Sequence, residues 1–281
     1  MSFLQVIPDL FSILRHKLHL VKLKNPFLFE TVKFLILSFL IIFVAYTGIR
    51  DLNYRWQWYR LPDYLFEITG TGFTAGPLLS GLGLTLFISA LSLVLAVVFG
   101  FVTALFRLSE SVTAVYFSRI YLEAIRNTPL LIQLFLIYFV AAPILGLSRT
   151  VSAVLALSLF EGAYASEIIR SGIISIEKGQ WEAAHSLGLS RRQTSQFISR
   201  PQAFRQILPM LASQAISLIK DSALVSTIAV YELTMQGQVA ISQTFLAFEI
   251  WFTVALIYLI INLSLSFIIQ IFEKRMKKAV I

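Results

Sequence analysis

Long apolar tracts alternate with shorter polar segments along most of the chain. A helix needs about 20 predominantly apolar residues to cross the hydrocarbon core of a bilayer. These tracts indicate bilayer spans, because a helix of a soluble protein keeps its apolar residues in a stripe along one face. The pattern therefore predicts an all-α integral membrane protein with about six membrane-spanning helices. The expected spans are residues 34–49, about 81 to 107, 127–148, 151 onward, 206–230 and 250–272.

Composition agrees with this class. Of the 281 residues, 57% are hydrophobic and 14% are charged, and the mean hydropathy is +0.79. Soluble domains carry roughly 25% charged residues, so a water-soluble fold is not expected. The net charge of +8 lies mainly between the apolar tracts, which indicates membrane orientation and not nucleic-acid binding. The chain has no cysteine, and we expect neither a metal site nor a catalytic site.

The distribution of Lys and Arg predicts the orientation. Alternating the six spans places residues 1–33, 107–119, 170–205 and the C-terminal tail on one side, with 17 of the 23 basic residues. Cytoplasmic loops carry the excess of Lys and Arg. We therefore expect both termini in the cytoplasm.

The first 80 residues form a basic leader (1–33), followed by the first span and a connector rich in Trp and Tyr (34–80). We interpret the span as an uncleaved anchor, because no small-x-small cleavage pattern follows it. The aromatic connector is typical of the headgroup region, and we expect it on the extracytoplasmic side. Apolar residues of the leader have helical spacing, which fits either an amphipathic helix on the membrane surface or a floppy tail. These residues are Leu10, Phe11, Leu14, Leu18 and Val21.

The longest polar interruption, at 170–205, contains a segment suited to a short docking helix. Ala183 and Leu187 are paired at i, i+4 and are flanked by Ala184 and Gly188, so one face is small enough for a groove on another protein. A short alanine-containing helix without a docking role fits the same residues. The pattern alone leaves both interpretations open.

The order of residues in this loop resembles a known motif. Glu182-Ala183-Ala184, three residues, Gly188, nine residues and Ile198 is similar to the EAA loop of ABC importer permeases. Arg200 precedes Pro201, where that pattern usually has leucine. From about residue 81 to the C-terminus the chain also resembles the polar-amino-acid permeases, of the histidine, glutamine, glutamate or arginine type. The stretches that carry this resemblance are Arg126–Phe135, Tyr164–Arg170, Pro201–Arg205 and Lys220–Leu224.

The resemblance implies a five-helix permease core at 81–281, preceded by one extra span, in the bacterial inner membrane. It implies that the 170–205 loop couples transport of a polar amino acid to a cytoplasmic ATPase dimer. It also implies a second permease, identical or a sister subunit, a substrate-binding protein outside and membrane lipid as partners. The residues that would contact the ATPase are Gln180, Glu182, Ala183, Ala184, Leu187, Gly188 and Arg191.

ATP chemistry is expected in a partner subunit. The chain has no G-x-x-x-x-G-K-[ST] motif to cradle phosphates, so we expect a transport subunit that is not an enzyme. ATP and Mg would be bound by the ATPase, and we expect no cofactor in this chain.

Polar residues inside the predicted spans are candidates for the substrate path, because charge within a bilayer is costly. A carboxylate at Glu161 favours a substrate with a positive group, while a buried protonated Glu is the alternative. Lys220 and Asp221 are neighbours that either line the path or form a structural pair or cap. Thr128 and Gln133 supply polar groups next to a proline, although a simple kink explains them equally well.

A secondary transporter or channel for a small polar solute would share the spans and the intramembrane charges. Transporter folds often contain two related halves, and no convincing internal repeat is present in this sequence. An intramembrane enzyme is a third class, but no Ser/His/Asp arrangement or metal-ligand cluster lies at matching depth in the predicted spans. The sequence therefore favours the permease subunit of an ATP-driven importer.

Overall fold

The computed structural model describes residues 26–51, 54–69 and 72–278. The chain divides into two compact units, Met1–Trp56 and Gln57–Ile281. The boundaries expected after residues 33 and 80 stay predictions.

The described part of the first unit contains the helix α2 (Pro26–Asp51). Proline is favoured at the first position of a helix, and Arg50 in the last turn lies at the negative end of the helix dipole. Large apolar side chains such as Phe34 and Phe39 are exposed, which suits a lipid environment. The helix is long and apolar enough to cross a bilayer. The amphipathic leader helix considered for residues 10–21 lies outside the described residues.

The second unit is built on two long helices that pack along each other, α4 (Pro77–Leu108) and α8 (Arg149–Ile174). A Cβ at Gly100 would lie 2.7 Å from the Cβ of Ala165, so the two backbones approach closely there. Ser158 also donates a hydrogen bond to the backbone oxygen of Ser92 at 3.3 Å. Small residues and hydroxyls allow this packing in a bilayer, where lipid tails are as apolar as the side chains.

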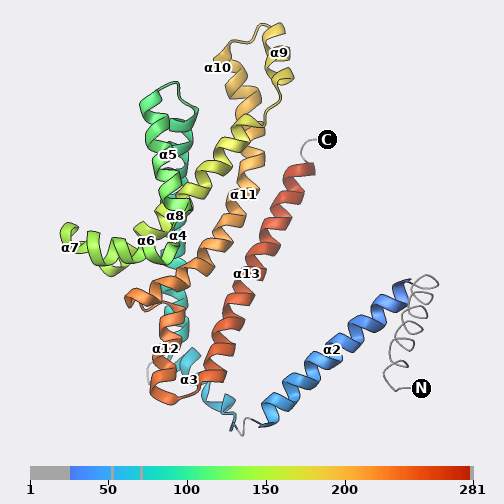
Figure 1. The fold of residues 1–281 in the computed structure, drawn as a ribbon, viewed down its shortest axis with the longest axis vertical. Helices are drawn as coiled ribbons and strands as arrows, with labels where there is room; N and C mark the ends of the chain where they lie inside the picture. The colour runs from blue at the N-terminus through green and yellow to red at the C-terminus, as the bar shows by residue number, and fades with distance from the viewer. Residues whose placement is uncertain (1–25, 52–53, 70–71, 279–281) are drawn as a thin grey trace, which may run out of the picture. The chain divides into compact units, whose positions relative to one another are not determined.

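The chain bends sharply after α5 (Val112–Arg126). The following segment begins with α6 (Leu130–Phe135) and meets α5 at 107°. Pro129 lies at this bend with extended backbone, and its missing N–H prevents a continuous helix. The segment projects sideways from the other helices (Figure 1). It continues through a π-helical turn, η2 (Leu136–Ala141), and α7 (Ala142–Leu145).

The last third of the chain contains a second interruption. Ala229 follows a 3-10 helix with φ = +56°, so the chain turns there before it continues. Glu232 then caps the next helix by accepting from the N–H groups of Thr234 and Met235, each at 2.9 Å. The elements are α11 (Arg200–Asp221), η4 (Ser222–Ile228), α12 (Leu233–Thr244) and α13 (Ala247–Lys278).

The all-α membrane class is confirmed, but the count of six spans is not. Among the described residues, α2, α4, α8 and α13 are long and apolar enough to cross a membrane, and the bent α5–α6 pair makes five if it counts as one span. The expected loop at 107–119 is largely helix α5, and the expected span at 127–148 is broken at its start. The expected span at 206–230 does not qualify, because polar residues interrupt α11 and its α-helix ends at Asp221.

A small connector packs on the ends of α4 and α13. Its antiparallel hairpin pairs Glu67 with Thr74 and was not predicted from the sequence. The N–H of Gln57 donates to the buried carboxylate of Glu249 at 2.7 Å, which ties the connector to the first turn of α13. The connector comprises η1 (Trp58–Arg60), α3 (Pro62–Leu65), β1 (Phe66–Thr69) and β2 (Gly72–Ala75).

Candidate functional site

The EAA-like segment folds as a short helix, α9 (Lys178–Ser186), that ends just before Gly188. The N–H of Gly188 donates to the backbone oxygen of His185 at 2.9 Å, and the N–H of Leu189 donates to that of Ala184 at 3.1 Å. These two bonds form a Schellman motif, which requires left-handed backbone after the helix. Gly188 has φ = +80°, and a Cβ there would meet no atom within 4 Å. Glycine is therefore favoured by the left-handed backbone conformation and not by a lack of space for a side chain.

A capping box begins the next helix, α10 (Arg191–Thr194). The side chain of Gln193 accepts from the N–H of Ser190 at 2.9 Å, and the hydroxyl of Ser190 accepts from the N–H of Gln193 at 3.4 Å. A π-helical turn, η3 (Ser195–Ser199), then joins α10 to α11. The turn between α9 and α10 is thus fixed by hydrogen bonds on both sides.

The α9–α10 segment (residues 178–194) lies at the end of the second unit opposite α12 and α3 (Figure 1). Ala184 is 1% exposed and packs inward, whereas Leu187 is 81% exposed. The structure therefore brings one face of the segment to the surface, and the docking role of that face stays a prediction. The exposed candidates are Gln180, Glu182, Ala183, Leu187, Gly188 and Arg191.

The segment is attached to the bundle through α8 and α11. A Cβ at Gly172 would lie 2.3 Å from Cγ1 of Ile207, so the two helices are in close contact where the segment leaves them. Ser175 donates a hydrogen bond to the side chain of Gln206 across the same junction. The α9–α10 segment is therefore connected to two helices that contact each other at the junction.

Glu161 is buried in α8, at 1% exposure. The side-chain amide of Gln214 on α11 donates to its Oε2, while its Oε1 has no hydrogen-bond partner among the described residues. Asp221, at the end of α11, lies near enough to interact with it electrostatically. Lys220 is exposed, and no ion pair within 4 Å joins it to Asp221 in the described part of the chain. Glu161 and Asp221 are thus brought together, and Lys220, which interacts electrostatically with Asp221, stays exposed beside them.

Gln133 and Thr128 lie at the bend between α5 and α6. The amide nitrogen of Gln133 donates to the backbone oxygen of Ile125 at 2.7 Å and to the hydroxyl of Thr128 at 2.9 Å. These bonds satisfy groups that the bend leaves without helical partners. The oxygen of the Gln133 amide is buried without a partner among the described residues. A substrate contact for this pair stays a prediction.

A cluster of charges joins α4 to α8. Arg107 near the end of α4 and Arg170 on α8 both donate hydrogen bonds to the carboxylate of Glu167. Glu167 lies in the stretch Tyr164–Arg170, and its pairing with Arg107 could not be predicted from the sequence, because the two residues are 60 positions apart.

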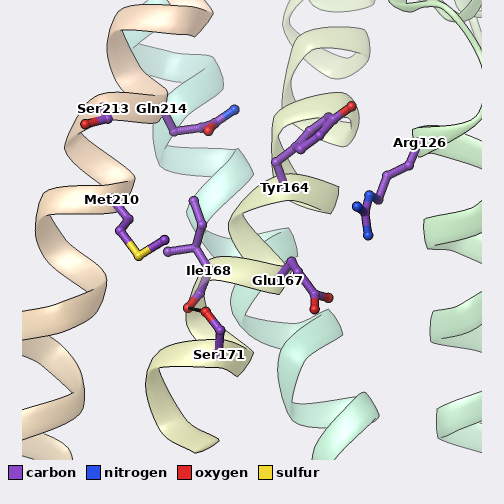
Figure 2. A pocket seen from close by; sticks show the side chains of 8 residues that line it. All are labelled: Arg126, Tyr164, Glu167, Ile168, Ser171, Met210, Ser213 and Gln214. Carbon is purple, nitrogen blue, oxygen red and sulfur yellow. Dashed lines mark hydrogen bonds between the residues drawn. The ribbon is translucent and has the colours of Figure 1, made fainter. Parts of the chain in front are cut away.

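A cavity of about 440 Å³ opens beside this cluster, between α8, α11 and the end of α5 (Figure 2). The guanidinium of Arg126 lies 5.8 Å from the centre of the Tyr164 ring, within the range of a cation–π contact. Both residues lie in stretches that resemble the polar-amino-acid permeases, and neither is among the site residues expected from the sequence. The polar lining comes from Arg126, Tyr164, Glu167, Ser171, Ser213 and Gln214.

Comparison with known proteins gives consistent matches. Residues 96–278 match the family model described as binding-protein-dependent transport system inner membrane component. The chain is 42% identical over 204 residues to the glutamine transport system permease protein GlnP of Escherichia coli (strain K12), covering 71% of this chain and 93% of that protein. It is 39% identical over 207 residues to the L-cystine transport system permease protein TcyB of Bacillus subtilis (strain 168), covering 73% and 88%.

A solved structure agrees with this assignment. The crystal structure of an amino acid ABC transporter with histidines matches with a TM-score of 0.67 and 36% identity, covering 71% of this chain and 94% of that chain. The expected permease resemblance and fold are therefore confirmed. The chain belongs to the family of binding-protein-dependent transport system inner membrane components, as a permease subunit of an ABC transporter.

Proposed function

We propose that this chain forms the translocation path for a polar amino acid and that its α9–α10 segment docks on a cytoplasmic ATPase. The observation that carries the proposal is the fixed turn at Gly188, which presents Glu182 and Leu187 at one end of the bundle. A rigid exposed segment joined to α8 and α11 suits a part that transmits motion between subunits.

A polar amino acid is the proposed substrate. Relatives named as glutamine and L-cystine permeases support it, and so does a solved relative described with histidines. Glu161 supports a positive group on the substrate, because its second oxygen is buried without a partner among the described residues. Thr128, Gln133, Lys220 and Asp221 are the further candidates for the path.

The proposed assembly contains subunits that the chain itself does not supply. An ATPase dimer would bind ATP and Mg, and this chain would need no cofactor and perform no catalysis. A second permease, self or sister, would complete the path, a binding protein would deliver substrate from outside, and membrane lipid would surround the spans. The basic residues of the α9–α10 segment support a cytoplasmic location for it and, with the basic tail, cytoplasmic termini in a bacterial inner membrane.

Co-purification with the ATPase tests the docking proposal. We expect the detergent-solubilised chain to retain its native ATPase, and Glu182→Lys and Gly188→Asp to lose it while still inserting normally into the membrane. Glu110→Lys is a matched control, because Glu110 is also exposed but lies between α4 and α5, outside the α9–α10 segment. If the mutants retain the ATPase as well as the wild type does, docking by this segment is wrong.

A further inference from the structure

Arg126 is a cation without an ionic partner in the described part of the chain. It is the last residue of α5, at the 107° bend, and no carboxylate of a described residue lies within 4 Å of it. An arginine inside a membrane protein is costly unless it is paired or faces a water-filled path. Arg126 is exposed and lines the 440 Å³ cavity, so it satisfies the second condition.

Neither of the two nearby carboxylates forms an ion pair with Arg126. Glu167, on the wall of the same cavity, accepts from Arg107 and Arg170. Glu123, one turn before Arg126, accepts from the side-chain amide of Asn127 at 2.8 Å. Arg126 is therefore the cation of the cavity wall that remains available to a ligand.

The position of the guanidinium also suits recognition of a small anion. The guanidinium lies 5.8 Å from the centre of the Tyr164 ring, and its N–H groups donate to no described residue, so they are available to a ligand. A planar guanidinium binds a carboxylate through two parallel hydrogen bonds. The cavity volume falls in the range of about 300–1,000 Å³ that small-molecule sites occupy.

We propose that Arg126 binds the α-carboxylate of the amino acid in the translocation path, with Tyr164 holding the guanidinium in place. This inference rests on the proposed function, because it requires an amino-acid substrate. It adds a specific role that the side-chain-directed candidates Glu161 and Asp221 do not supply: every amino acid carries an α-carboxylate, so Arg126 recognises the class and not the individual side chain.

A purely structural role for Arg126 makes a different prediction. A cation in the last turn of α5 is stabilised by the helix dipole, and lysine would serve equally well. Such a role would not distinguish a ligand with a carboxylate from the same ligand with a carboxamide. Ligand chemistry therefore separates the two interpretations.

The experiment uses the complete importer, permease with ATPase and binding protein, in proteoliposomes. Uptake of L-glutamine, L-histidine, L-glutamate, L-arginine and L-cystine first establishes which of them is carried. The affinity of the detergent-solubilised permease–ATPase complex is then measured for that amino acid and for its α-carboxamide, in the wild type, Arg126→Gln, Arg126→Lys and the control Arg119→Gln. Arg119 is exposed on the same helix but does not line the cavity.

We expect the wild type and Arg119→Gln to prefer the carboxylate by about tenfold or more, since a hydrogen bond to a charged group contributes roughly 1.5–3 kcal/mol. Arg126→Gln should lose this preference and Arg126→Lys should keep part of it. The comparison of the carboxylate with the carboxamide in the wild type does not depend on whether any variant folds. If the wild type transports an amino acid but shows no carboxylate preference, or Arg126→Gln keeps it, the role of Arg126 is wrong and the transport function stands. If none of these amino acids is transported, the proposed substrate class fails together with this inference.

Discussion

At the scale of single residues, backbone conformation explains why one position of the α9–α10 segment carries glycine. Gly188 and Gly179 both have open space where a Cβ would be, but only Gly188 has a positive φ, of +80°. Left-handed backbone costs a residue with a Cβ roughly 1–2 kcal/mol. A methyl group is therefore tolerated at Gly179 and strained at Gly188.

We expect Gly188→Ala to weaken binding of the ATPase by about tenfold, since 1.4 kcal/mol corresponds to that factor. Gly179→Ala should leave it nearly unchanged. The measurement is a titration of the purified ATPase against the permease in nanodiscs. Equal affinities for the two variants would show that the Schellman turn does not matter for docking.

At the scale of elements, the contact between α4 and α8 depends on close approach of the two backbones. A Cβ at Gly100 would lie 2.7 Å from the Cβ of Ala165 and 2.9 Å from the backbone nitrogen of Ser166. The backbone atom cannot move aside as a flexible side chain would. A larger residue at this position must push the helices apart.

Gly100→Val should destabilise the folded permease by about 1–3 kcal/mol, as overpacking does in other cores. The matched control is Gly83→Val on the same helix, where no atom lies within 4 Å of the added Cβ. Thermal unfolding in detergent should show a lower Tm for Gly100→Val and no decrease for Gly83→Val. A similar decrease in both would show that the close contact with α8 is not the cause.

At the scale of the whole molecule, the second unit presents different surfaces at its two ends. The connector with α3 lies at one end and the α9–α10 segment lies at the other (Figure 1). Tyr59 in the connector is 77% exposed and Leu187 in the segment is 81% exposed. The chain contains no cysteine, so single cysteines report on each end without further changes.

We expect a membrane-impermeant thiol reagent to label Tyr59→Cys in intact cells and Leu187→Cys only after the membrane is opened. The positive-inside distribution of Lys and Arg is the physical reason. Labelling is read on a gel as a mass shift. The reverse pattern would overturn the proposed orientation and the cytoplasmic docking role with it.

Local sequence determined the features that depend on solvent and on short-range bonding. Apolar tracts indicated the membrane class, because the contrast between lipid and water acts on each residue separately. The polar loop at 170–205 predicted a short helix around Glu182, and the structure contains one at Lys178–Ser186. The membrane class and the short helix both depend on residues that are close together in the sequence, within one or two helical turns.

The tertiary structure decided the features that depend on residues far apart in the chain. Pro129 predicted an interruption of the helix, but the bend of 107° between α5 and the segment that begins with α6 appears only in the tertiary structure. The bond from Gln57 to Glu249 spans 192 positions, and the pairing of Arg107 with Glu167 spans 60. The Arg126 cavity likewise needs α5, α8 and α11 together. The sequence determined which segments are apolar spans and which are polar. Packing between distant segments determined which polar groups lie close together.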